Sequence, residues 1–115
     1  MNLKWIKCGD DGHWCNFLNL NLNSVNAVGV YVIWHGGNNP HVVRVGQGDI
    51  AARLADHKQN NDIVRHRNKG NLFVTWASVS SQANRDGIER FLAEQYSPLE
   101  GTRFPDVPAI PVNLF

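Results

Sequence analysis

Two stretches rich in β-branched and aromatic residues lie close together in the 115-residue chain, with a run of glycine, asparagine and proline between them. The stretches are Val28–His35 and His41–Gly46, and the run is Gly36–Pro40. This pattern predicts an antiparallel β-hairpin. If the first four residues of the run form the loop, Tyr31 lies opposite Arg44 and the two side chains share one face of the sheet.

Two later stretches have apolar residues at a helical period. Asp49 is a good N-cap for a helix that runs to about Gln59, and a second helix is predicted from about Gln82 to Tyr96. Asn71–Ser80, between them, has the composition of a third core strand. The residues predicted to face the core are Ile50, Ala51, Leu54 and Ala55 in the first helix and Ile88, Phe91, Leu92 and Tyr96 in the second.

The first 27 residues predict additional strands. Residues 4–8 and 13–17 read as a hairpin around an Asp-Gly turn, and Asn19–Asn23 alternates leucine with asparagine as a half-buried strand does. The hairpin places Cys8 and Cys15 opposite each other. We expect free thiols in a reducing compartment, and with the one histidine between them the cysteines match no common zinc spacing.

Composition and charge set the size of the protein without selecting a partner. The chain is long enough for one hydrophobic core, and its apolar fraction of 43% is ordinary for a globular domain. A formal net charge of +1 neither demands nor excludes a nucleic acid. No stretch resembles a signal peptide or a transmembrane span, so we expect a soluble, cytoplasmic protein.

The segment Gly46–Ala51 fits the Gly-x-Gly-x-x-Gly/Ala pattern of dinucleotide-binding folds. Such a fold also needs an acidic residue at the end of the next strand and further parallel strands with their helices. The next predicted strand ends without a carboxylate, and the strands before the glycines form an antiparallel hairpin. The pattern alone is therefore weak evidence for a dinucleotide.

Several charged residues are predicted to converge where a sheet face meets two helix edges. Glu89 projects beside the apolar stripe of the second helix, where a carboxylate costs free energy unless an arginine or a divalent cation pairs with it. A glutamate at this border can also extend to water. Arg53 and His57, four residues apart, line one edge of the first helix, and Tyr31 and Arg44 share the sheet face.

Four short motifs resemble those of the GIY-YIG nuclease superfamily in order and spacing. They are GVY (Gly29–Tyr31), RVG (Arg44–Gly46), RLADH (Arg53–His57) and ERFLAEQYSP (Glu89–Pro98). The resemblance implies an α+β fold with a small antiparallel three-stranded central sheet flanked by helices. In the single domain 1–115, residues 28–98 are then the catalytic module, residues 1–27 an N-terminal hairpin and strand extension, and residues 99–115 a proline-rich docked tail.

The resemblance also implies a metal-dependent endonuclease that hydrolyses phosphodiester bonds with one divalent cation, Mg²⁺ or Mn²⁺. Tyr31 would take the proton of the attacking water, which requires a pKa well below the ~10 of free tyrosine, and nearby cations favour this. Arg53 would bind the non-bridging oxygens, and Glu89 would hold the metal. His57 would orient the water or a phosphate, or bond to a neighbouring backbone group as a surface histidine does.

Arg44 departs from the family pattern, in which the second motif opens with tyrosine. An arginine there could hold phosphate or lower the pKa of the catalytic tyrosine, and it could instead mark a nucleic-acid-binding module without turnover. Gly46 and Gly48 would let the backbone turn and approach the substrate. A third alternative is a protein-interaction domain in which Glu89 and Arg53 form a buried ion pair.

Substrate binding needs phosphate contacts beyond the catalytic residues. The candidates follow the first helix and are Lys58, Arg65, Arg67 and Lys69. The expected partner is a nucleic acid, in the first place DNA, brought by a partner protein or bound by a homodimer, and no membrane partner is expected. Asn113 is a candidate for the asparagine that the family often has after its second helix.

Overall fold

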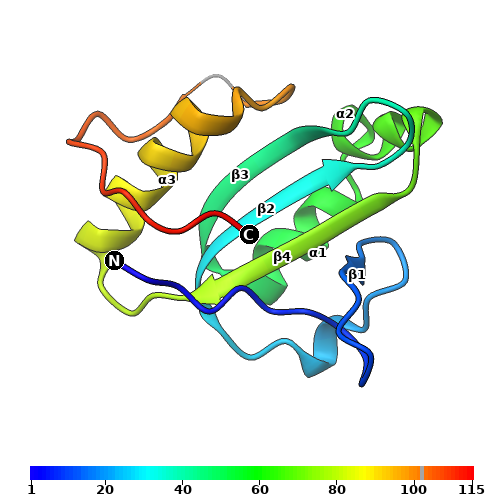
Figure 1. Ribbon diagram of the computed structural model, residues 1–115, viewed down its shortest axis with the longest axis horizontal. Coiled ribbons are helices and arrows are strands. Elements are labelled where there is room, and N and C mark those ends of the chain that lie inside the picture. Colours follow the sequence, from blue (N-terminus) through cyan, green and yellow to red (C-terminus); the bar gives the residue numbers. More distant parts are fainter. Residues whose placement is uncertain (102) are drawn as a thin grey trace.

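A four-stranded antiparallel sheet with helices on both faces forms an α+β fold, and its strand order is β1-β4-β2-β3 (Figure 1). The computed structural model describes residues 1–101 and 103–115. Its elements are β1 (Cys15–Asn16), η1 (Leu22–Ser24), β2 (Val28–His35), β3 (His41–Asp49), α1 (Ile50–Lys58), α2 (Asn61–Val64), η2 (Arg65–Lys69), β4 (Leu72–Ser78) and α3 (Gln82–Tyr96). The predictions of β2, α1 and α3 are confirmed.

The hairpin of β2 and β3 has a different register from the predicted one. Its loop has one residue more than predicted, so that His35 pairs with His41, and a β-bulge further along adds a second extra residue on β3. Tyr31 therefore pairs with Gly46, not with Arg44. Because the two offsets add up to two residues, and side chains alternate along a strand, Tyr31 and Arg44 still share one face.

Two hydrophobic layers form the core, one on each face of the sheet (Figure 1). Ile50 and Leu54 of α1 are buried in the first layer, and Ile88 and Leu92 of α3 are buried in the second. Each such side chain contributes about 1.5–3 kcal/mol on burial. The prediction for Ala55 is wrong, because α1 meets the sheet along a narrow stripe that leaves this residue exposed.

The N-terminal residues form less strand than predicted. Of the expected hairpin, an isolated bridge between Cys8 and His13 and the two-residue strand β1 are present, and β1 pairs with β4. The sheet therefore has four strands instead of the expected three. The strand predicted over Asn19–Asn23 is wrong, because the side chain of Asn21 accepts a hydrogen bond from the backbone N–H of Asn23 and caps η1.

A disulfide bond joins Cys8 to Cys15, which contradicts the expectation of free thiols. The bridge that pairs Cys8 with His13 and the pairing of β1 with β4 bring the two Cα atoms to 4.9 Å, within the range that a disulfide spans.

The C-terminal residues contact both the edge of the sheet and the N-terminal segment, and they cross in front of the sheet in Figure 1. The backbone N–H groups of Leu99 and Glu100 donate to carbonyls of β3. The side-chain amide of Asn113, the candidate for the asparagine of the resembled family, exchanges hydrogen bonds with the backbone of Leu3 and so joins the C-terminal tail to the N-terminal segment. No helix in the described part of the chain is long and apolar enough to cross a membrane.

The disulfide is expected to stabilise the N-terminal segment against unfolding. It closes a short loop with a sequence separation of 7, and the loss of chain entropy in the unfolded state corresponds to about 2.5 kcal/mol. Replacing both cysteines by serine should lower the free energy of unfolding in urea by about this amount, with the slope of the transition nearly unchanged. An equally stable double variant would show that the cross-link contributes nothing.

Candidate active site

Tyr31 and Gly46 form a packed pair at the centre of the β2–β3 hairpin. The tyrosine is 2% exposed and faces its cross-strand partner Gly46. A Cβ atom at position 46 would overlap the Tyr31 hydroxyl oxygen and the ring carbon that carries it, so no other residue fits there without moving the ring. The glycine of the second motif is therefore needed because it leaves room for the tyrosine of the first.

The Tyr31 hydroxyl and the imidazole of His57 are hydrogen-bonded, with 2.6 Å between the hydroxyl oxygen and Nε2. The Asp49 side chain caps α1 by accepting from the N–H of Ala52, and this start of the helix directs His57 toward β2. Burial raises the pKa of Tyr31 to about 12 and lowers the pKa of His57 to about 4. At neutral pH both groups are uncharged, so the hydroxyl donates and the imidazole accepts.

The raised pKa of Tyr31 contradicts the expectation that nearby cations bring it below its ordinary value. Arg44 and Arg53 do lower this pKa, but burial raises it more, and the charge of Glu89 acts in the same direction as burial. The phenol is therefore fully protonated in the free protein. Its proton can leave only toward an acceptor in direct contact, and His57 is in that position.

Glu89 reaches the same group of residues from the opposite side of the sheet. It lies on α3, which packs on the face that α1 does not cover, and its side chain is half-buried. Burial raises its pKa to about 7, and the neighbouring Asp86 adds to this effect, while Arg44 and Arg53 oppose it. Among the described side chains, none forms an ion pair with Glu89 within 4.0 Å.

The five predicted catalytic residues are thus brought together at the edge strand β3. The charges of both Arg44 and Arg53 shift the pKa values of Tyr31, His57 and Glu89, so the five residues lie within range of electrostatic interaction, and Tyr31 and His57 are in direct contact. Arg44 is half-buried on β3, whereas Arg53 is exposed on α1. The prediction that they converge was made from alternation along strands and from helical period, and the corrected hairpin register leaves it intact.

Gly48 has a different role from Gly46. Its φ of +125° lies in the region that side-chain-bearing residues rarely adopt, and it follows Gln47 where β3 approaches the start of α1. A Cβ at position 48 would lie 3.2 Å from the Nε of Arg53. Gly48 therefore allows the backbone conformation at this turn and leaves space for the Arg53 side chain that lies over it.

A hydrogen-bond network that was not predicted from the sequence fixes α3 to β3 beside this site. The buried guanidinium of Arg85 donates to the backbone carbonyls of Val79 and Ser80 and to the side-chain oxygens of Gln47 and Gln82. Both glutamines in turn donate to Asp86, at 3.0 and 3.1 Å. Gln47 lies between the two site glycines on β3, and Asp86 is one helical turn before Glu89, so the network sets where Glu89 lies. No motif or periodicity in the sequence singles out Arg85.

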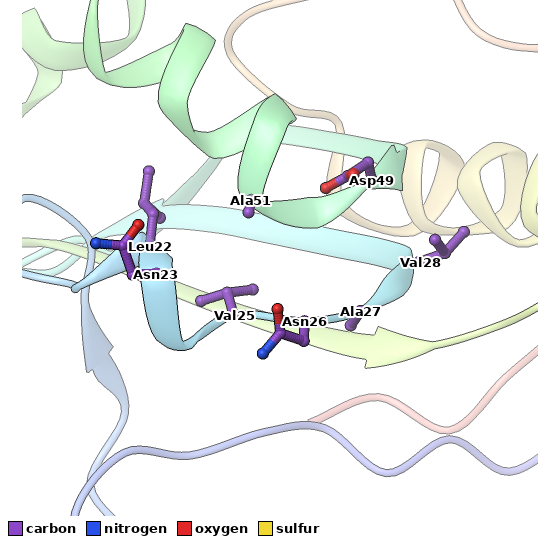
Figure 2. Close-up of a pocket in the computed structure, with 8 residues that line it drawn as sticks. All are labelled: Leu22, Asn23, Val25, Asn26, Ala27, Val28, Asp49 and Ala51. Atoms are coloured by element: carbon purple, nitrogen blue, oxygen red, sulfur yellow. The ribbon is translucent and has the colours of Figure 1, made fainter.

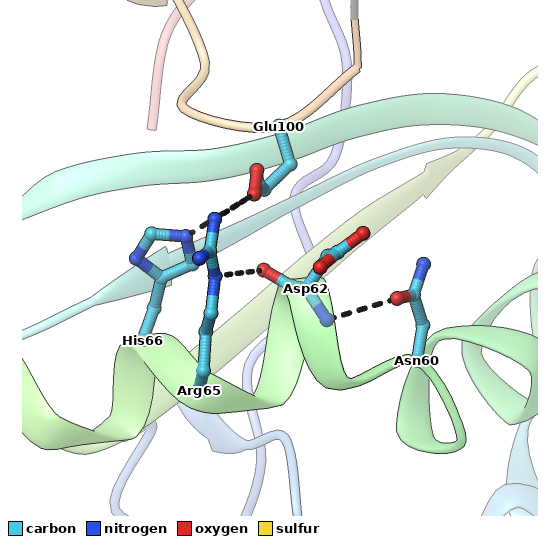
Figure 3. Close-up of polar contacts among 5 residues, drawn as sticks. All are labelled: Asn60, Asp62, Arg65, His66 and Glu100. Carbon is cyan, nitrogen blue, oxygen red and sulfur yellow. Dashed lines mark hydrogen bonds and ion pairs between the residues drawn. The ribbon is translucent and has the colours of Figure 1, made fainter.

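The predicted substrate-binding cations differ in what they contact. The Lys58 ammonium donates to the Leu20 carbonyl at 2.8 Å, and the Arg65 guanidinium donates to the Glu100 carboxylate at 2.8 Å (Figure 3). These two side chains hold other parts of the chain, which argues against their prediction as substrate contacts. Arg67 and Lys69 are exposed, and neither has an ion pair or side-chain hydrogen bond among the described residues.

Glu100 joins the C-terminal tail to η2 across the edge of β3. Its carboxylate lies 3.6 Å from Nε2 of His66 as well as bonding to Arg65 (Figure 3). His66 is buried and neither ring nitrogen has a hydrogen-bond partner within the described chain. Burial lowers the pKa of His66, which keeps it neutral at physiological pH. Glu100 therefore has a structural role that its place in a loop did not reveal.

A pocket of about 450 Å³ has none of the predicted catalytic residues in its lining (Figure 2). It lies between η1, residues 25–28 and the start of α1, and its lining includes a single ionisable side chain, Asp49. That carboxylate already caps α1. We place the candidate chemistry at the cluster on β3 because the pocket offers no second titratable group with which Asp49 could act.

Glu89 is suited to hold one divalent cation. A half-buried carboxylate with a raised pKa and no ion-pair partner in the described residues gains free energy when a cation compensates its charge. Mg²⁺ commonly binds through one or two carboxylates, several waters and substrate phosphate oxygens. In the described chain there is no group of three or more histidine, cysteine, aspartate or glutamate residues that could hold a metal ion.

Comparisons with known proteins provide no relative for the chain. No protein-family model matches it, and no curated protein and no solved structure is significantly similar to it.

The charge of Arg44 should be measurable through the titration of His57. Replacing Arg44 by glutamine removes a cation that lowers the His57 pKa, so this pKa should rise from about 4 toward its ordinary value of 6.5. Histidine side-chain ¹H–¹⁵N spectra recorded against pH measure the change. Arg90→Gln is the matched control, because Arg90 lies on α3 with Glu94 as its partner and should leave the titration unchanged. Equal curves for all three proteins would place Arg44 away from His57.

Proposed function

We propose that the protein is a GIY-YIG-type endonuclease that hydrolyses nucleic-acid phosphodiester bonds with one divalent cation. The observation that carries the proposal is the convergence of a neutral tyrosine–histidine pair, two arginines and an unpaired glutamate at one edge of the sheet, all within the described chain. Each of these residue types matches a need of the reaction. The three adjacent strands β4, β2 and β3, with α1 and α3, lie in the part of the chain that the motifs cover.

Hydrolysis requires that a water lose its proton as it attacks the phosphorus atom. With its own proton donated toward His57, the Tyr31 oxygen has lone pairs that can accept a hydrogen bond from that water. As the water proton moves to the tyrosine oxygen, the tyrosine proton can move to Nε2 of His57. The charge-balanced result is hydroxide transferred to phosphorus and a protonated imidazole, and the phenol never has to carry a full negative charge.

His57 is a weak base in the free site because burial and the arginines lower its pKa to about 4. A bound phosphate carries negative charge, which opposes the effect of the arginines and raises the affinity of the imidazole for a proton. Substrate binding would therefore raise the pKa of His57 and make its imidazole a stronger base. Arg53 would compensate the negative charge of the phosphate. Its guanidinium is exposed and can donate two parallel hydrogen bonds to phosphate oxygens.

Glu89 is the proposed ligand of the cation. Bound there, a Mg²⁺ or Mn²⁺ ion would supply charge stabilisation for the oxygen that leaves phosphorus. Below its pKa of about 7 the carboxyl group is mostly protonated, and a proton must be released before it can bind a cation. The apparent affinity for the cation should consequently increase as the pH rises toward 7.

Two other functions were compatible with the sequence. A protein-interaction domain built on a buried Glu89–Arg53 ion pair has no support, because the described side chains show no such pair and Arg53 is exposed. A nucleic-acid-binding module without turnover keeps some support from Arg44, which replaces a tyrosine and cannot accept a proton. The tyrosine–histidine hydrogen bond favours the enzyme, because a binding module needs no proton acceptor beneath its phosphate site.

The proposed substrate is a nucleic acid, in the first place DNA. Arg67 and Lys69 on η2 are exposed cations without partners in the described chain and can neutralise phosphates beyond the reacting one. With a net charge of only +1, the chain has a small electrostatic attraction for a long duplex. We therefore propose that a partner protein or a second copy of the chain helps to hold the substrate.

The proposal is tested by cleavage of labelled duplex, branched and single-stranded DNA and RNA with Mg²⁺ or Mn²⁺. Tyr31→Phe removes the proton acceptor and should slow cleavage by about 10²-fold or more. Glu89→Gln removes the ligand charge and should abolish the dependence of the rate on cation concentration.

The matched control is Glu94→Gln, since Glu94 is an exposed glutamate on the same helix whose surface pair with Arg90 contributes little to stability. This variant should cut as fast as the wild type. Cleavage that survives in Glu89→Gln and Tyr31→Phe, with all variants shown to be folded by circular dichroism, would exclude the proposed site.

A further inference from the structure

Arg44 has a buried donor that nothing in the described chain satisfies. Its Nε atom is inaccessible to solvent and has no hydrogen-bond partner among these residues. A buried N–H group left without a partner costs about 1–3 kcal/mol, and more when the group is charged. Because buried polar groups in folded proteins are nearly always hydrogen-bonded, the Arg44 guanidinium lacks a partner that an anion could provide, once the groups that cover Nε move aside to admit it.

The backbone around Arg44 holds the guanidinium without neutralising it. Leu99 and Glu100 are hydrogen-bonded to the carbonyls of Val42 and Val43, the two residues before Arg44, and this pairing brings the tail against β3. The next residue, Gly101, has a φ of +90°, and a Cβ there would lie 2.5 Å from Nη1 of Arg44. The glycine thus lets the tail lie directly on the guanidinium.

The carboxylates on either side leave Arg44 without an ion pair in the described structure. Glu100, the nearest acidic residue along the tail, is bonded to Arg65 and lies beside His66. Glu89 responds to the charge of Arg44 but forms no ion pair with it among the described side chains. The positive charge is consequently close to the reacting groups and is still available for an anion.

Among the cations of the site, Arg44 has the largest influence on the reacting groups. Its charge shifts the pKa values of Tyr31, His57 and Glu89 more than that of Arg53 does. An anion that binds Arg44 therefore lies within the cluster and not at its rim. Guanidinium groups are always charged and present several donors in one plane, a geometry that suits the oxygens of phosphate.

We propose that Arg44 binds the non-bridging oxygens of the substrate phosphate together with Arg53, so that two guanidinium groups hold one anion. This inference rests on the proposed function and specifies the substrate contact of the same site. Arg44 then does not replace a tyrosine in proton handling, because it has no basic atom to offer. Proton transfer falls to Tyr31 and His57, and Arg44 adds a phosphate ligand in the position where the resembled family has a phenol.

The test uses inorganic phosphate as the probe, on the full chain and without divalent cations. In wild-type protein, the ¹H–¹⁵N signal of Arg44 Nε should shift on titration with phosphate at constant ionic strength. Arg44→Gln should raise the dissociation constant for phosphate by about tenfold or more, and Arg44→Lys, which keeps the charge but loses the planar donors, should raise it less. Arg90→Gln, with its guanidinium bonded to Glu94, should bind phosphate as the wild type does.

An Arg44 Nε signal that does not move, or an unchanged dissociation constant in a folded Arg44→Gln variant, would overturn the inference. If that variant does not fold, the wild-type signal alone decides. The outcome is separable from that of the proposed function. Arg44-dependent phosphate binding without any cleavage would keep the inference and reject the nuclease, whereas Glu89-dependent cleavage with Arg44-independent phosphate binding would do the reverse.

Discussion

The electrostatics of the candidate site depend on the burial of ionisable side chains beside the edge strand β3. Burial shifts the pKa of Tyr31 to about 12, that of His57 to about 4 and that of Glu89 to about 7, and each shift favours the uncharged form. The two arginines beside them keep their charge. In the free protein at neutral pH, Tyr31 and His57 are therefore uncharged and Glu89 is about half protonated, so the two guanidinium charges are only partly compensated, which favours the binding of a phosphate anion.

Local packing rather than strong ion pairing maintains this arrangement. Glycine at position 46 admits the tyrosine ring, glycine at 48 leaves space beneath Arg53, and glycine at 101 lets the tail lie on Arg44. The buried network around Arg85 attaches the first turns of α3 to β3 and so fixes the position of Glu89 relative to β3. Because fully satisfied polar networks are rigid, the site residues on the two faces of the sheet have little freedom to move relative to one another.

The sequence predicts the elements that have a clear period and misses the contacts that depend on the fold. Alternation and helical phase were enough to predict β2, α1 and α3. The same reasoning predicts that Tyr31, Arg44, Arg53, His57 and Glu89 converge. The hairpin register was wrong by two residues, one from a loop longer than predicted and one from a β-bulge that leaves no simple mark in the sequence. Tyr31 and Arg44 still share a face because the total offset is even.

The disulfide was missed because a reducing compartment was assumed, although the predicted hairpin already placed Cys8 opposite Cys15. The role of Glu100 and the network around Arg85 could not be predicted from local pattern, because each joins segments that are distant in sequence. The pKa of Tyr31 was predicted in the wrong direction for a related reason. The charges around it were visible in the sequence, but the extent of its burial was not, and burial is the larger effect.

The most direct test of this account is the pKa of Glu89, measured by carbon-detected NMR of the side-chain carboxyl group with and without Mg²⁺. The account predicts a pKa of about 7 in the cation-free protein, because the carboxyl group is buried without an ion-pair partner in the described chain. It also predicts that Mg²⁺ lowers this pKa, because the cation binds the ionised form. A value close to the ordinary 4.5 that does not respond to Mg²⁺ would contradict both the buried cluster and the proposed metal ligand.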